Sequence, residues 1–415
     1  MGAVTLSAGP FECRLCEHDQ AHVLLDLGLL PLANDFVQSP DDDTDRQTEP
    51  VVLVMCEECK LLQLRDLVPP RRMFETYLWT SSSSEAAKAH AQSFARMVAG
   101  RYPVGDHPFL VEVASNDGLL LRSMKAEGYR VLGVDPSNLA DEATASGVPT
   151  MRAFFAEDAA RRIVEEHGQA DVVVARNVIG HVANLRGLLA GLRKLLRPEG
   201  ALIVESPYAH GLRSELQYDT IFHEHVSYLT MTTLAEALRR YGLVATDTTF
   251  VPMNGGSFLC HAHRTDKANS AHGLDSILEL ERVFELNEPR GWTWYAAAVQ
   301  QQREQLRGLL TRLTSEGNRV TGYGAAAKAM TMFNYCDLTP ELVMVVADGN
   351  PRKQGLFCPG VRIPVVSPEQ MLELKPDYVL IAAWNFTQEI AGQLRARNYP
   401  GQFLVPLPVP RTVSD

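Results

Sequence analysis

The chain has 415 residues, of which 46% are hydrophobic and 21% are charged, and its formal net charge is −11. This length predicts two to four domains whose cores are large enough to need no disulfide bridges. The 39 basic residues are outnumbered by 50 acidic ones, which argues against a nucleic-acid partner because no basic tract offsets them. There is no apolar run of about 18 residues and no signal-peptide pattern at the start. We therefore expect a cytoplasmic protein with no membrane partner.

Seven cysteines are present, and four of them form two Cys-x-x-Cys pairs, Cys13 with Cys16 and Cys56 with Cys59. An odd count with this spacing suits a reduced, metal-binding protein better than a disulfide framework. Four thiolates on two tight turns make a closed tetrahedral zinc site. We predict a structural zinc that supplies folding energy to a small module over residues 1–70. Redox-active or coincidental pairs are the alternative.

Residues 71–107 contain a run of serines followed by a helical pattern, and Ser84 or a neighbour is suited to cap that helix. Tyr77 and the serines directly precede the next unit. They either fold over its mouth or form an exposed linker, and the pattern alone favours neither.

The next stretch predicts a strand over Phe109–Val113, a polar turn, a helix over Leu119–Glu127 and a second strand over Val131–Asp135. This order, with an acid ending the second strand, is typical of a nucleoside site in an α/β sheet.

The turn carries polar and acidic groups where a pyrophosphate site would use glycines and a bare helix N-terminus. These groups, Glu112, Asn116, Asp117 and Gly118, suit the sulfonium and amino groups of S-adenosylmethionine and disfavour NAD. Asp135 is placed to accept the ribose hydroxyls, and Phe154 with its neighbours Ala153 and Phe155 to flank the adenine. The alternative is that Asp135 only ends a strand and that the phenylalanines belong to the core.

Further strands are predicted over 171–175 and 201–206, separated by a helix over 183–196 that stops at the turn Arg197-Pro198-Glu199-Gly200. A helix near 231 and two strands around Gly255-Gly256 follow, and these strands read as an antiparallel pair. Parallel strands that end in such a pair predict a class I, Rossmann-like methyltransferase domain over residues 71–265.

Two histidines, two acids and two tyrosines lie within the segment 218–228. His223 and His225 are two residues apart, which is not the HExxH spacing of a zinc site. A general base with an orienting carboxylate, Glu224, is the better use of this pattern, since a histidine accepts a proton near neutral pH. His181, after the third strand, lies at the same carboxyl edge and could join them.

Taken together, these motifs resemble the zinc-containing nucleotide-sugar C-methyltransferases of deoxysugar and antibiotic pathways, such as the 3-C-methyltransferases for mycarose and tetronitrose. The resemblance covers the whole chain through paired Cys-x-x-Cys, E-x-x-S-N-D-G, GVDP, RNVIGHV, YDTIFHEHVSY, NGGS and GYGAAAK. It implies a dTDP-linked 4-keto-6-deoxysugar as substrate. It also implies a base at His225, surrounded by Glu224, His181 and Tyr77. Ala114, Phe222 and Asn254 depart from the family pattern, which commonly has Gly, Tyr and His there.

Residues 266–415 begin with helical stretches and then hold a second strand–turn–helix pattern, with Gly322, Gly324 and Ala327 in the turn and Asp348 ending the next strand. Alone this would suggest NAD. The resemblance instead implies a Rossmann-like α/β domain that helps hold the nucleotide sugar. Our candidates for these contacts are Tyr323, Lys328 and Asn385; a purely structural domain is the alternative.

We expect a methyl transfer from S-adenosylmethionine to the sugar carbon beside C4, with C3 favoured over C5. His225 would remove the proton, Glu224 would orient the imidazole, and His181 or a tyrosine hydroxyl would donate to the enolate oxygen. The remaining candidates are Asn177 for the cofactor and His223, Tyr228 and Asn254 for the substrate. We expect a monomer. A binding protein without catalysis and an NAD-dependent oxidoreductase are the competing functions.

Overall fold

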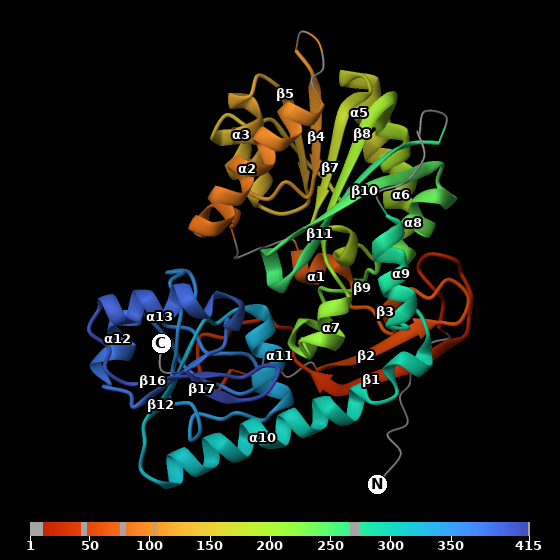
Figure 1. Cartoon of the computed structure of the whole chain (residues 1–415). Helices are drawn as coiled ribbons and strands as arrows, with labels where there is room; N and C mark the ends of the chain where they lie inside the picture. Colours follow the sequence, from red (N-terminus) through yellow and green to blue (C-terminus); the bar gives the residue numbers. More distant parts are fainter. Residues whose placement is uncertain are drawn as a thin grey trace.

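The computed structural model describes residues 11–42, 48–74, 80–102, 105, 107–265 and 274–413. Three sheets organise this part of the chain (Figure 1). Tyr77, one of the candidate catalytic residues, lies outside the described residues. Within the described ranges, no helix combines the length and the apolar character needed to cross a membrane.

The first sheet is antiparallel, with its strands in the order β1-β2-β3-β9. The strands are β1 (Ala21–Leu30), β2 (Glu49–Cys56), β3 (Leu62–Leu64) and β9 (Ser227–Tyr228). The short helix α1 (Pro70–Phe74) follows β3. Because β9 comes directly after residues 223–225, the edge of the N-terminal sheet holds that histidine-rich segment.

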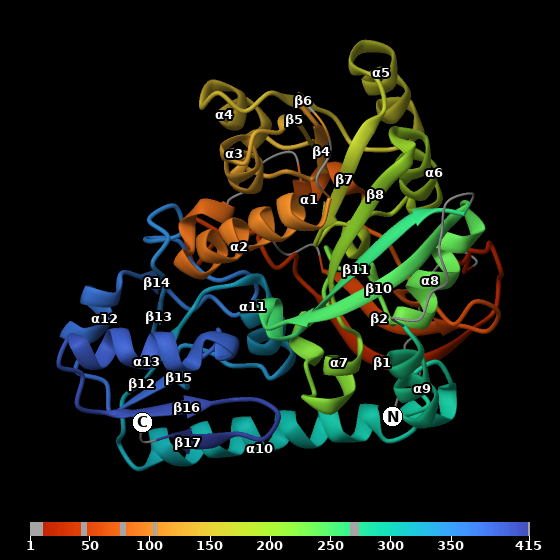
Figure 2. The same cartoon turned by 45° about the horizontal axis from the view of Figure 1, so that its top comes forward.

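The second sheet has the strand order β10-β11-β8-β7-β4-β5-β6. Its members are β4 (Phe109–Val113), β5 (Arg130–Asp135), β6 (Thr150–Arg152), β7 (Ala170–Arg176), β8 (Leu196–Pro207), β10 (Leu243–Val251) and β11 (Ser257–Arg264). Strands β4 to β8 are parallel, while β11 is antiparallel to both β8 and β10. The expected antiparallel pair is thus confirmed, and Figure 2 shows it as a hairpin along one side of the sheet.

Helices cover both faces of this sheet. One face is covered by α2 (Glu85–Arg101), α3 (Leu119–Ala126) and α4 (Leu139–Ala145), the other by α5 (Glu157–His167), α6 (Leu185–Leu195) and α8 (Met231–Arg240). Within β4, Leu110 belongs to the apolar core under α2, α3 and α4, while Val111 and Val113 belong to the core under α5, α6 and α8. This is the alternation of side chains that a strand requires. Apolar residues therefore fill both faces, and polar residues are left for the strand ends.

The third sheet has the order β14-β13-β12-β15-β16-β17 and is parallel except for β17. It contains β12 (Val320–Tyr323), β13 (Val346–Ala347), β14 (Val365–Val366), β15 (Tyr378–Ile381), β16 (Gln402–Val405) and β17 (Arg411–Val413). Its helices are α11 (Ala327–Tyr335), α12 (Pro368–Glu373) and α13 (Thr387–Ala396). The expected fold class is confirmed: an N-terminal region with a four-cysteine cluster is followed by two mainly parallel α/β sheets.

Two helices link the sheets to one another. Helix α9 (Asp275–Val283) packs on α8, and α10 (Tyr295–Ser315) runs along the bottom of Figure 1 from beneath β1 to the third sheet. The short helix α7 (His210–Ser214) follows β8.

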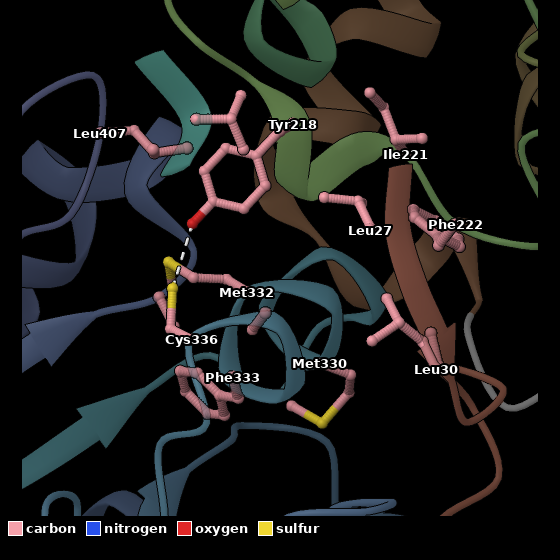
Figure 3. Packing of buried hydrophobic residues seen from close by; sticks show 14 of the residues in the cluster. Leu27, Leu30, Tyr218, Ile221, Phe222, Met330, Met332, Phe333, Cys336 and Leu407 are labelled. Atoms are coloured by element: carbon pink, nitrogen blue, oxygen red, sulfur yellow. Dashed lines mark hydrogen bonds between the residues drawn. The ribbon is translucent and has the colours of Figure 1, made fainter. Parts of the chain in front are cut away.

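A shared apolar core lies where the first and third sheets meet. The 3₁₀ helix η3 (Tyr218–Thr220) packs on α11, and Tyr218, Ile221 and Phe222 belong to one buried cluster with leucines of β1 and methionines of α11 (Figure 3). The Tyr218 hydroxyl lies 3.3 Å from Cys336 Sγ and donates to Gln302 at 2.6 Å. The segment that carries His223 and His225 therefore starts from a rigid, fully buried anchor.

Two element boundaries differ from the sequence interpretation. Helix α6 ends at Leu195, and Arg197–Gly200 already belongs to β8 instead of forming a turn. Gly200 is needed there because a Cβ would lie 2.9 Å from the Asp171 carbonyl oxygen. The strand that was expected to end at Asp348 spans only Val346–Ala347.

Candidate active site

The two Cys-x-x-Cys turns bring four thiols together, and their Sγ atoms lie within 4.8 Å of one another: Cys13, Cys16, Cys56 and Cys59. Both turns use the same hydrogen bond, from Glu17 N–H to the Cys13 carbonyl and from Lys60 N–H to the Cys56 carbonyl. A tetrahedral zinc with Zn–S bonds of about 2.3 Å separates its sulfur atoms by about 3.8 Å. The measured Sγ–Sγ distances of 3.4 and 3.5 Å approach this value, so the four thiols fit the predicted structural zinc.

The zinc module also holds the segment 223–225. His223 donates from Nε2 to the Glu49 carbonyl at 3.1 Å, and Asn34 donates to Glu224 Oε1 at 2.5 Å. Both partners belong to the N-terminal module, whose strand β3 pairs with β9 immediately afterwards. The zinc module therefore contributes directly to the position of this segment.

The turn after β4 has an unusual backbone, since Ala114, Asn116 and Gly118 all have positive φ (56°, 52° and 77°). It is held by Asp135 at the end of β5, whose Oδ2 accepts from Asn116 N–H at 2.8 Å. The other carboxylate oxygen accepts from the Ser137 backbone and hydroxyl at 3.0 and 2.6 Å. Asp135 therefore shapes the turn as well as lining the site.

The serine run lies against this turn. Ser81 N–H donates to Asn116 Oδ1 at 2.9 Å, and Ser82 N–H donates to Asp117 Oδ2 at 3.1 Å. Ser84 caps α2 by accepting from Ala87 N–H. The sequence allowed the serines either to fold over the next unit or to form an exposed linker. The first hypothesis is confirmed for Ser81 and Ser82.

A buried ionic cluster at the same sheet edge was not expected from the sequence. Arg176, at the end of β7, pairs with Glu112 at 2.9 Å, and His90 of α2 pairs with Glu205 of β8 at 2.7 Å. Burial raises the pKa of Glu112 to about 7, although Arg176 opposes the shift. Glu112 Oε2 is buried with no hydrogen-bond partner among the described residues. Arg176 and Glu205 lie near the ends of the neighbouring strands β7 and β8, and this placement in the sequence could have been used to predict them as site residues.

One cavity of about 760 Å³ connects these groups to the rest of the candidate site. It is lined by twelve of the sequence-predicted residues, namely Glu112, Asn116, Asp135, Phe154, Asn177, His181, Glu224, His225, Tyr228, Asn254, Lys328 and Asn385. Four candidates are not among its lining residues: Asp117, Gly118, His223 and Tyr323. Asp117 and His223 instead hold neighbouring segments in place.

His225 and His181 face each other in this cavity, with ring centroids 4.7 Å apart at an angle of 84°. His225 donates from Nδ1 to the Thr220 carbonyl at 2.7 Å, and the Phe222 ring lies 4.1 Å from its centroid. Burial lowers the pKa of His225 to about 4 and that of His181 to about 3. Both imidazoles are thus neutral at pH 7, and His225 is oriented by donating to the Thr220 backbone carbonyl, not by Glu224 as expected.

The third sheet contributes Lys328, the second residue of α11, and Asn385 of the 3₁₀ helix η6 (Trp384–Phe386). Lys328 donates to Asn385 Oδ1 and lies 4.4 Å above the Trp384 ring. Burial lowers the pKa of Lys328 to about 8, and the nearby Asp219 opposes this shift. The C-terminal part of the chain therefore contributes one of the cations that line the cavity, besides Arg71 and Arg176.

Comparison with known proteins decides the family. Residues 13–74 match a zinc binding domain family, residues 91–248 a methyltransferase domain, and residues 252–408 a C-methyltransferase C-terminal domain. The chain is 33% identical over 406 residues to the C-methyltransferase NovU of Streptomyces niveus, covering 97% of both sequences. This chain belongs to the zinc-containing C-methyltransferases. The family expected from the motifs is confirmed.

Solved structures also resemble parts of this C-methyltransferase. One is magnesium protoporphyrin IX methyltransferase from Synechocystis PCC 6803, at 17% identity and a TM-score of 0.34 over 43% of this chain and 83% of that chain. Another is the CcbJ methyltransferase from Streptomyces caelestis, at 13% identity and a TM-score of 0.34 over 42% and 89%.

The enzyme is an S-adenosylmethionine-dependent C-methyltransferase with a structural zinc. The residues at the β4 edge fit such a cofactor, because Glu112 lines the cavity and has one carboxylate oxygen without a partner among the described residues, which suits a cationic group. The competing functions, a non-catalytic binding protein and an NAD-dependent oxidoreductase, are not supported by the family match.

Proposed function

We propose that this C-methyltransferase acts on a dTDP-linked 4-keto-6-deoxysugar and adds the methyl group to a carbon beside the C4 ketone, with C3 favoured. S-adenosylmethionine supplies an electrophilic methyl group on its sulfonium. The protein must then generate a nucleophilic carbon, align it with that methyl group and exclude water from it.

The observation that carries this proposal is the state of His225. A carbonyl oxygen can only accept a hydrogen bond, so Nδ1 of His225 holds the ring proton toward Thr220 and Nε2 keeps its lone pair. Its pKa of about 4 keeps the ring unprotonated at working pH. An unprotonated imidazole with a lone pair on Nε2 can take up the proton next to a ketone. The carbon then attacks the methyl group, the carbon–sulfur bond breaks, and its electron pair stays on sulfur.

The remaining roles follow from position. We propose that Asp135 accepts the ribose hydroxyls and that Glu112 meets the charged end of the cofactor. Asn116, Asp117, Gly118, Phe154 and Asn177 would complete the cofactor site. Glu224 and His181 would lie beside the sugar, joined by Tyr77. His223, Tyr228 and Asn254 are the other substrate candidates.

The nucleotide is proposed to extend toward the third sheet, because Asn385 and the start of α11 line the same cavity as His225. Tyr323 would support this end from outside the cavity. We propose domains over residues 1–70, 71–265 and 266–415, and a monomer as the working enzyme.

Incubation with S-adenosylmethionine and a dTDP-4-keto-6-deoxysugar tests the proposal. We expect a sugar product heavier by one methyl group, and NMR should place the methyl at C3. A methyl at C5 would keep the substrate class and change the position. His225→Ala should lower the rate by about 10²- to 10⁴-fold, with cofactor binding unchanged in calorimetry. Unaltered sugar with the wild-type enzyme would overturn the proposed substrate.

A further inference from the structure

Lys328 is a buried cation that the C-terminal part of the chain places in the catalytic cavity. It lines the cavity together with His225, and its charge is one of the factors that lower the pKa of His225. An ammonium group carries three N–H donors. One of them is directed to Asn385 Oδ1, so others are available to a ligand in the cavity.

Trp384 lies between the Lys328 ammonium group and Asp219 and contacts both. The indole face lies beneath Lys328 at 4.4 Å, while the indole N–H donates to Asp219 Oδ2 at 2.7 Å. Asp219 is fully buried on η3, six residues before His225. The titratable groups that interact electrostatically with Lys328 are thus Asp219 and His225. Both belong to the segment that carries the proposed base.

Removal of a proton beside a ketone moves negative charge onto the ketone oxygen, which needs a donor. His181 is poorly suited to that role. Burial lowers the pKa of His181 to about 3, so its ring is neutral at pH 7 and brings no positive charge to the enolate oxygen. Arg176, another cation of the cavity, is paired with Glu112.

We propose that Lys328 is a catalytic residue, whose ammonium group donates a hydrogen bond to the ketone oxygen of the sugar and stabilises the enolate formed when His225 removes the adjacent proton. This rests on the proposed function, and it assigns Lys328 to the reacting atoms instead of the nucleotide. The proton goes to His225 Nε2, the C–H electron pair forms the carbon–carbon double bond of the enolate, the C=O π pair moves to the ketone oxygen, and Lys328 keeps its own proton. Subsequent attack on the methyl group restores the ketone.

The variant that tests this role is Lys328→Met, which keeps the length of the side chain and removes the charge. Two rates are measured: methyl transfer with S-adenosylmethionine, and exchange of the sugar α-proton with D₂O, followed by NMR. We expect both kcat values to fall by about 100- to 1000-fold while KM for the nucleotide sugar changes little. Unchanged cofactor affinity in calorimetry would show that the variant is folded, since that site lies at the β4 edge.

Lys328→Arg is the matched control, because it keeps the charge at a higher pKa. The wild-type rate should be highest between the pKa of His225, about 4, where the base becomes neutral, and that of Lys328, about 8, where the donor loses its charge. Lys328→Arg should recover part of the activity that Lys328→Met loses, and its rate should show no alkaline decline.

The outcomes separate the two proposals. If the wild-type enzyme methylates the sugar but Lys328→Met keeps kcat and raises only KM, Lys328 anchors the nucleotide and this inference is wrong. If the wild-type enzyme neither exchanges nor methylates the keto sugar, the proposed function itself fails.

Discussion

The two strand–turn–helix units, β4–α3 and β12–α11, hold their turns with the same hydrogen bonds. In the first unit, Asp135 accepts from the turn residue Asn116 with one oxygen and from Ser137, two residues on, with the other. In the second, Asp348 accepts from Ala325 of the turn and from Asn350, again two residues on. The acid that ends the second strand of each unit is therefore first a clamp for the backbone of the preceding turn.

The two units differ in what neutralises that acid. Lys353 is buried beside Asp348, with Nζ 4.0 Å from Oδ2, and donates to the Ala325 carbonyl at 2.7 Å. Asp135 has no ion pair within the described part of the chain and lines the cavity. The comparison teaches that two acids at matching strand ends differ in their availability to a ligand, because a buried lysine lies beside Asp348 and none of the described lysines lies beside Asp135. The second unit instead places Lys328 in the cavity that the first unit lines.

Among these predictions, the substitution of Asp348 in the second unit should have the largest effect on the free energy of unfolding. Asp348→Asn leaves Lys353 buried without its counter-charge, so we expect the free energy of unfolding to fall by about 3–5 kcal/mol. Cofactor affinity at the first unit should be retained. Denaturant titration measures the first quantity and calorimetry the second. The control is Asp377→Asn, at a half-exposed pair with Arg319, which should cost no more than about 1 kcal/mol.

The same substitution in the first unit should act on binding. Asp135→Asn removes the charge that we assign to the ribose hydroxyls, and we expect the Kd for S-adenosylmethionine to rise by about 10- to 100-fold, since charge-assisted hydrogen bonds contribute about 1.5–3 kcal/mol. Exposed Asp141 on α4 serves as the control, and its Asn variant should bind normally. Equal affinities for wild type and Asp135→Asn would remove the functional difference between the two acids.

The close approach at Gly133 of β5 provides a steric test. A Cβ there would lie 2.3 Å from Ser115 Oγ, whereas a Cβ at Gly322 of β12 would meet its nearest neighbour at 3.2 Å. We expect Gly133→Ala to destabilise the protein by about 1–3 kcal/mol and to weaken cofactor binding by displacing Ser115. Gly322→Ala should lower the free energy of unfolding by less, as measured in thermal or denaturant unfolding. A larger loss at Gly322 would contradict this ranking.

The smallest effect is expected at Ala114, which has a φ of 56°. A left-handed conformation costs a non-glycine residue about 1–2 kcal/mol, while glycine costs about 0.5–1 kcal/mol in the unfolded state. Ala114→Gly should therefore stabilise the protein by about 0.5–1 kcal/mol. Ala325, in the turn of the second unit, is not among the residues with positive φ. Ala325→Gly should destabilise, and a gain there would show that the strain argument is wrong.

The positive φ of Ala114 gives a physical reason why glycine is common at this position in the family. Glycine adopts positive φ without a Cβ clash, so a family that commonly has glycine at this position avoids the strain that Ala114 carries. Phe222, a second departure, packs against the His225 ring and brings no hydroxyl to it.

Local patterns in the sequence were sufficient for the zinc ligands, the parallel strands, the antiparallel pair and the polar turn after β4. Each of these depends on residues close together in the chain: two Cys-x-x-Cys turns, alternating apolar strands and an acid at a strand end. The sequence also pointed to His225 as a base candidate, which stays a prediction, but it named Glu224 as the orienting group, whereas the structure has the Thr220 carbonyl accept from His225 Nδ1.

Only the tertiary structure decided which distant groups meet. It paired Glu112 with Arg176 and His90 with Glu205, joined Asn34 to Glu224, and placed Lys328 in the cavity of His225. It also separated two similar acids by burying Lys353 beside only one of them. These contacts depend on packing between sheets and on burial, which sets pKa values through desolvation. The sequence by itself therefore determined the chemistry that this C-methyltransferase has available, and the packing of three sheets determined where each charged group acts.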